Sequence, residues 1–261
     1  MIRPTGWGVC IQPQGMTSER AAAIVAALEP RWYHNWSLEP FVGVTSTSFV
    51  PLVWDGLQQV TPAFKSALIG PPGHTWMLFN EPERPEQSNM TPAEALDNTR
   101  AFLANQWRTG NEFQWAAPGV SLTTTDHDGL AWLTEFAQLC RRMGLSRPSY
   151  WHVHLNAASL QELRDAWDRW QAWYATWGAC APVIVSEVCA QNAPLSTQLA
   201  VLNWVHHRLL NQQIAAAAWF IGAPSTFVDW PNAALCTLDG QRARLTPLGA
   251  VWETTARSAK P

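Results

Sequence analysis

Residues 76–82, with the sequence WMLFNEP, contain four apolar residues followed directly by an amide, a carboxylate and a proline. The apolar run is typical of a buried β-strand, and Pro82 ends it because proline has no N–H for a ladder hydrogen bond. Asn80 and Glu81 therefore fall at the carboxyl end of a strand, where barrel enzymes carry their catalytic groups. Taken alone, the motif is equally typical of a helix-capping turn with a solvated glutamate.

A second stretch has the same pattern of an apolar run followed by a carboxylate. Residues 182–187, PVIVSE, place Glu187 at the end of another apolar run. Ends of strands on opposite arcs of one barrel face each other across its mouth. Glycoside hydrolysis requires such a pair, because one carboxyl group protonates the leaving oxygen while the other attacks the anomeric carbon or activates water. The pairing favours Glu81 and Glu187 as catalytic residues more than either motif does alone.

The rest of the chain alternates short apolar runs with longer amphipathic segments, which is typical of βα units around a parallel sheet. Strands are expected at residues 6–11, 31–35, 49–54, 76–80, 113–117, 150–155, 183–187 and 215–221. Helices are expected at residues 18–28, 62–68, 92–107, 129–143, 160–177, 196–211 and 247–256. These predict an α/β fold of the (β/α)8 TIM-barrel class, one domain over residues 1–261, with a weak or missing helix after the second strand.

Polar side chains alternate with apolar ones on the sixth expected strand. His152, His154 and Asn156 are spaced by two and therefore share one face of that strand. We expect His152 to be a satisfied core residue, and His154 or Asn156 to hydrogen-bond Glu187 or a sugar hydroxyl. Two histidines on one strand without a further matched ligand give little support to a metal site, so none is expected.

Tryptophan is unusually abundant, with 17 in 261 residues. One group recurs at helical spacing and predicts a buried helix face: Trp167, Trp170, Trp173 and Trp177. A second group lies at the ends of expected strands, where indole faces can pack on sugar rings: Trp36, Trp54, Trp151, Trp219 and Trp230. From this rim we expect Trp36, Trp54 and Trp219, together with Asn35, to bind substrate.

Charge and composition exclude several partners. The formal net charge is −3 and no basic block is present, so nucleic acid is not expected. No apolar run is long enough to cross a bilayer, and the first residues lack the features of a signal peptide, which leaves the compartment open. The five cysteines are scattered without a C-x-x-C pair, and one disulfide remains possible. We expect a monomer without cofactors.

Together these motifs resemble glycoside hydrolase family 128, the β-1,3-glucanases of clan A, whose catalytic domain is also described as an alkali-sensitive-linkage-type glycosyl hydrolase domain. The resemblance covers nearly the whole chain in one order. It runs through residues 32–36, 51–54, 78–82, 89–95, 117–119, 153–154, 185–187, 219–220, 238–240 and 245–249.

The resemblance implies Glu81 as general acid/base, Glu187 as nucleophile, Asn80 as the partner of a sugar 2-hydroxyl, and β-1,3-glucan as substrate. The corresponding mechanism is a double displacement with retention, which needs no metal or organic cofactor. The chain departs from the family in two places. It has Ser186 before the nucleophile where the family usually has threonine, and Asn156 where the family tends to have tyrosine.

Three alternatives stay open from the sequence. A non-catalytic β-glucan-binding barrel would keep the tryptophan rim but would have no reason to hold two carboxylates at catalytic separation. A glycosidase of another β-glycan specificity would keep both. A metal-dependent isomerase or lyase using His152 and His154 would lose activity on chelation.

Overall fold

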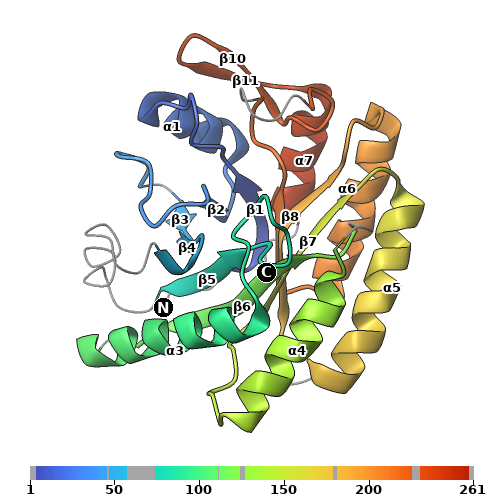
Figure 1. The fold of residues 1–261 in the computed structure, drawn as a ribbon. Helices are drawn as coiled ribbons and strands as arrows, with labels where there is room; N and C mark the ends of the chain where they lie inside the picture. The colour runs from blue at the N-terminus through green and yellow to red at the C-terminus, as the bar shows by residue number, and fades with distance from the viewer. Residues whose placement is uncertain are drawn as a thin grey trace.

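The computed structural model describes residues 4–45, 47–57, 74–110, 112–123, 127–178, 181–224 and 230–258. Its centre is a curled parallel sheet of nine strands in the order β3-β2-β1-β9-β8-β7-β6-β5-β4 (Figure 1). The strands are β1 Gly6–Cys10, β2 Trp32–His34, β3 Ser48–Phe49, β4 Leu52–Val53, β5 Thr75–Asn80, β6 Gln114–Ser121, β7 Trp151–Ala157, β8 Val183–Ala190 and β9 Ala216–Trp219.

The two outer strands of the sheet, β3 and β4, come from one short stretch of chain. Only Val50 and Pro51 separate them. β3 pairs with β2, and the Val50 amide next to β3 donates to the Tyr33 carbonyl of β2. β4 pairs with β5, and the Pro51 carbonyl next to β4 accepts from the Met77 amide of β5. The third expected strand is thus divided between two partners. The parallel α/β architecture is confirmed, but the sheet is TIM-barrel-like and does not form the expected regular eightfold barrel.

Helices cover the outside of the sheet (Figure 1). They are α1 Ser18–Leu28, α3 Pro92–Thr109, α4 Gly129–Arg142, α5 Leu160–Trp177, α6 Leu195–Leu210 and α7 Pro247–Ser258, each within two residues of its expected bounds. The helix expected at residues 62–68 lies outside the described residues. As expected, the described part of the crossover between residues 37 and 48 contains no helix.

Local sequence explains where α3 begins. The Thr91 hydroxyl accepts from the amide of Glu94, and the Glu94 carboxylate accepts from the amide of Thr91, which satisfies two amides that the first turn leaves unpaired. Pro92 at the first helical position loses nothing, because its missing N–H would have had no partner there. None of the described helices is both long and apolar enough to span a membrane.

One element was not expected from the sequence. Strands β10 Cys236–Asp239 and β11 Arg242–Leu245 form an antiparallel hairpin whose turn contains Gly240 at φ 61°. The Asp-Gly pair is a hairpin turn signal, although the flanking residues alternate only weakly. Arg20 of α1 donates to the Gly240 carbonyl at 2.9 Å and ties the hairpin to the barrel exterior.

Close packing inside the sheet depends on Gly119 of β6. A Cβ atom at this position would lie 2.5 Å from Cε1 of His152, which is fully buried on β7. Gly119→Ala should therefore lower the free energy of unfolding by about 1–3 kcal/mol, the usual cost of overpacking, measured by urea denaturation. In the Gly119→Ala/His152→Ala double variant the loss should be smaller than the sum of the single losses, because the clash is gone. Strict additivity would contradict this account.

Candidate active site

Backbone irregularities aim both candidate catalytic carboxylates. Glu81 follows β5 in the left-handed region, at φ 44°, with its amide donating to the Gly119 carbonyl at 2.7 Å. On β8, Val185 pairs with Val153 of β7 and Glu187 pairs with His154, so Ser186 is the extra residue of a β-bulge. Left-handed backbone at a non-glycine residue is strained, and such strain is concentrated at functional sites.

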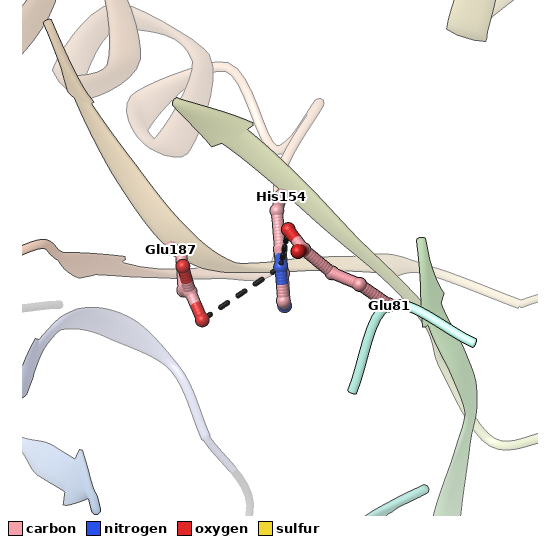
Figure 2. Close-up of side chains that lie close together, drawn as sticks. All are labelled: Glu81, His154 and Glu187. Atoms are coloured by element: carbon pink, nitrogen blue, oxygen red, sulfur yellow. Dashed lines mark hydrogen bonds and ion pairs between the residues drawn. The ribbon is translucent and has the colours of Figure 1, made fainter. Parts of the chain in front are cut away.

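Glu81 and Glu187 meet at one histidine. The Nδ1 atom of His154 lies 2.9 Å from Oε1 of Glu81 and 3.7 Å from Oε1 of Glu187 (Figure 2). One oxygen of each carboxylate and this nitrogen all lie within 4.8 Å of one another, and all three residues are buried. The fold thus brings together two carboxylates that are 106 positions apart in the chain.

Both oxygens of Glu187 accept a hydrogen bond. Trp36 Nε1 donates to Oε1 at 2.7 Å, and Asn156 Nδ2 donates to Oε2 at 2.8 Å. The expectation that a polar residue of the sixth expected strand contacts Glu187 is met by Asn156, the residue that replaces the family's tyrosine. The indole of Trp36 acts here through its N–H, a role that its position after a strand did not indicate.

Glu81 is held by two cations. Besides His154, the Nη1 atom of Arg84 lies 3.1 Å from Oε2 of Glu81, and Glu86 in turn anchors the Arg84 guanidinium. Sequence reasoning missed Arg84, although its spacing of three residues from Glu81 was a visible signal. Nearby, Glu83 accepts from the Ser121 amide of β6 at 2.7 Å and fixes the loop after β5 to the next strand.

The charges in this cluster shift each other's pKa. Burial opposes the charged form of His154, but Glu187 and Glu81 outweigh it and raise the pKa of His154 to about 9. Burial also opposes the ionisation of Glu81, yet the hydrogen bond and charge of His154 and the charge of Arg84 lower its pKa. For Glu187, burial dominates and the charge of Glu81 adds to it, so its pKa is raised. In the free protein, Glu187 is thus the more readily protonated carboxylate.

Beneath the carboxylates, a buried polar layer holds the backbone of β8. The Ser186 carbonyl accepts from Cys10 Sγ at 3.1 Å and lies 2.9 Å from Nε2 of His34, while the Ser186 hydroxyl contacts Nε2 of His152. Burial lowers the pKa of His34 to about 4 and that of His152 well below its usual value, so both rings are neutral. His152 is a buried core residue, as expected, but only its Nε2 is partnered, because Nδ1 has no hydrogen-bond partner among the described residues.

Two residues of the expected tryptophan rim are core residues. Trp219 is 0% exposed, packs against Trp7 at 6.3 Å between ring centroids, and donates through Nε1 to the Ala233 carbonyl at 2.8 Å. Trp151 begins β7, at the other end of the strand from the site, and packs on Trp173 at 4.9 Å. The prediction that Trp219 offers a sugar platform is therefore wrong. A position at a strand end does not decide which face of the strand carries the ring.

The expected rim exists in another form. Trp36 packs against Phe220 at 5.7 Å, and Phe220 packs against Trp230 at 5.3 Å. Trp36 and Trp230 are partly exposed, and Trp54 is likewise half-buried against the core. Trp36, Phe220 and Trp230 thus form an aromatic cluster that reaches Glu187 through Trp36, while the Trp54 carbonyl accepts from the Asn80 amide.

The two expected asparagine ligands differ in their surroundings. The Asn35 amide builds the loop after β2, because its Nδ2 donates to the Glu39 carbonyl at 3.0 Å and its Oδ1 accepts from the Ser37 amide at 3.2 Å. This does not support the expected role of Asn35 in substrate binding. Asn80 donates through Nδ2 to Gln87 at 3.0 Å, while its buried Oδ1 has no partner among the described residues. Asn80 thus retains a free acceptor beside Glu81.

A cation among Glu81, His154 and Glu187 is disfavoured by their protonation. With a pKa of about 9, His154 carries a proton on each ring nitrogen at neutral pH, and Nδ1 donates to Glu81. A metal ligand must be the neutral imidazole. His152 does not join this cluster because its Nε2 contacts Ser186. The arrangement does not favour the metal-dependent alternative.

A parallel barrel-like sheet with two buried, facing carboxylates, one directly after β5 and one on β8, is typical of glycoside hydrolases. The family model described as the glycosyl hydrolase catalytic core matches residues 9–252, and the chain belongs to this family. No curated protein sequence matches the chain.

Solved structures of family 128 enzymes share the fold. The chain is similar to an endo-β-1,3-glucanase from Amycolatopsis mediterranei in complex with laminaritriose, with 21% identity and a TM-score of 0.72 over 98% of this chain and 100% of that one. It is similar to an endo-β-1,3-glucanase from Sorangium cellulosum, with 20% identity and a TM-score of 0.74 over 96% and 98%. A curdlan-specific exo-β-1,3-glucanase from Blastomyces gilchristii has 19% identity and a TM-score of 0.71 over 97% and 100%. These structures share the fold of this chain, and the family that the chain belongs to is the glycosyl hydrolase catalytic core.

The contrast between two indoles gives a test of the site. Trp36→Phe removes the N–H that Glu187 accepts but keeps a ring, so kcat should fall roughly 10- to 100-fold, the worth of a hydrogen bond to a charged group, with little change in Tm. Trp219→Phe should lower Tm with little change in kcat, because it leaves the buried Ala233 carbonyl unpaired and does not touch Glu187. Steady-state kinetics and thermal denaturation of both variants measure this. A Trp36→Phe variant with wild-type kcat would contradict the role of Trp36.

Proposed function

We propose that this protein is a retaining glycoside hydrolase that cleaves β-1,3-glucan. The observation that carries the proposal is the separation of the two carboxylates, whose facing oxygens lie within 4.8 Å. Retaining enzymes hold their carboxyl groups about 5–5.5 Å apart, whereas inverting enzymes need about 6.5–9.5 Å to admit a water molecule. The short separation favours direct attack by one carboxylate on the sugar.

In this mechanism Glu187 attacks the anomeric carbon while Glu81 donates its proton to the leaving oxygen. In the second step Glu81 takes a proton from water, which displaces Glu187 from the covalent glycosyl-enzyme. Trp36 and Asn156 orient Glu187 through its two oxygens. Burial of two facing carboxylates is costly for a protein that only binds glycan, so the non-catalytic alternative is disfavoured.

The proposed substrate rests on the family 128 motifs and on the similar fold of β-1,3-glucanases. In this proposal the free Oδ1 of Asn80 accepts from the sugar 2-hydroxyl, next to the bond that is cleaved. The half-buried indoles of Trp36 and Trp54 contact neighbouring glucose units.

A panel of polysaccharides tests the substrate. Linear β-1,3-glucan should be hydrolysed to laminari-oligosaccharides, while β-1,4-glucan should give no product and mixed-linkage glucan should be cut only where β-1,3 bonds occur. Chromatography of the released oligosaccharides measures this, with Glu187→Gln as the inactive control. Preferential cleavage of β-1,4-glucan would instead support a glycosidase of another specificity.

Chemical rescue tests the two roles. Glu187→Ala should lose activity on every β-glucoside, and azide should restore turnover and release an α-glycosyl azide, because a single displacement inverts the anomeric centre. Glu81→Ala should still accept an activated aryl glycoside, and azide should then give the β-azide with net retention. NMR of the azide products measures this. Products with exchanged configurations would reverse the assignment of Glu81 and Glu187.

A further inference from the structure

The protonation of Glu81 in the free protein conflicts with its proposed first step. A general acid must carry a proton when the substrate arrives. Yet each oxygen of Glu81 contacts a cation, Oε1 the imidazolium of His154 at 2.9 Å and Oε2 the guanidinium of Arg84 at 3.1 Å. Neither oxygen can bind a proton readily while both contacts exist, because each oxygen faces a positive charge. One of the two cations must therefore move before Glu81 acts as an acid.

The surroundings decide which cation can move. His154 is 0% exposed and is enclosed within β7, so it has no space to leave. The Arg84 side chain is 26% exposed and lies on the loop after β5. Its Nε and Nη2 atoms are bound by Glu86, whose side chain is 52% exposed. Arg84 can lose its contact with Glu81 and remain paired with Glu86, at little cost in free energy.

Among the described residues, the charged groups that act on Glu81 come from its own loop and from the neighbouring strands. His154 faces it from β7, and Glu187 is coupled to it from β8. Its own loop contributes Arg84, Glu86 and Glu83. From the segment before α4, His127 acts on Glu86. Among these groups, only Arg84 is a cation that is both in contact with Glu81 and accessible to a ligand.

We propose that Arg84 is a positioning residue that the substrate displaces: in the free enzyme it ties Glu81 to Glu86, and the leaving-group sugar moves it aside before Glu81 donates its proton. This inference rests on the proposed function and on the assignment of Glu81 as the acid. Arg84 contacts Oε2 of Glu81 and His154 contacts Oε1, so a sugar oxygen that approaches Oε2 must replace the guanidinium.

Displacement of Arg84 also accounts for the proton. In the free enzyme the charge of Arg84 helps to lower the pKa of Glu81, while burial and the charge of Glu81 raise the pKa of Glu187. Loss of the Arg84 contact removes this cause and raises the pKa of Glu81. Glu81 then binds a proton more readily, and it can donate that proton to the leaving oxygen.

The test is the pH dependence of hydrolysis of laminari-oligosaccharides by Arg84→Gln. At high pH the rate falls as the general acid loses its proton, and this part of the pH profile is its alkaline limb. The alkaline limb of kcat/KM reports the pKa in the free enzyme, whereas that of kcat reports the pKa in the enzyme–substrate complex. Without the cation the pair keeps its proton to higher pH, so the alkaline limb of kcat/KM should shift to higher pH. The alkaline limb of kcat should stay where it is in the wild type, because there the substrate has already displaced Arg84.

Two further variants serve as controls. Arg100→Gln removes an exposed arginine of α3, paired with Asp97 at 3.7 Å, and should leave both limbs unchanged. Arg84→Lys keeps the charge and should keep the kcat/KM limb close to the wild type. If Arg84→Gln shifts neither limb, or shifts both equally, Arg84 is not displaced by substrate and the inference is wrong. A wild type that does not cleave the oligosaccharides would instead count against the proposed function.

Discussion

The site depends on one buried charge, the imidazolium of His154 between two carboxylates. Removing two carboxylates from water costs several kcal/mol per ion, and facing them at short distance adds repulsion. A buried cation within reach of both reduces each cost. The same contacts hold the proton on His154 and raise its pKa to about 9. His154 thus stabilises Glu81 and Glu187 as buried, facing carboxylates.

The fold provides the precision that this charge cluster needs. Parallel strands bring β5, β7 and β8 to the same end of the sheet, and the bulge at Ser186 turns Glu187 toward His154. Under it, the neutral rings of His34 and His152 bond to the carbonyl and hydroxyl of Ser186. A buried polar layer of this kind is tolerable only when its members are paired, and pairing makes it rigid. Ser186 belongs to this layer, whereas Asn156 donates directly to Glu187.

The charged loop after β5 is a second source of charge at the site. Arg84 and Glu86 form an ion pair at the mouth of the site that extends to Glu81. Exposed ion pairs are worth little for stability, so this one has more effect on the protonation of the carboxylate than on the fold. Together, His154 and Arg84 lower the pKa of Glu81 despite its burial.

Sequence alone determined the parallel α/β architecture, the bounds of most elements and the two carboxylates, because hydrophobic periodicity and strand-end motifs are local properties. It also predicted that His154 or Asn156 would hydrogen-bond Glu187 or a sugar hydroxyl, since alternate residues of a strand share a face, and the structure shows the bond from Asn156 to Glu187. Only the tertiary structure divided the third expected strand between β3 and β4 and buried Trp219. It alone directed the N–H of Trp36 to Glu187. These outcomes depend on which face of a strand meets which neighbour, and that is decided by contacts between residues far apart in the chain.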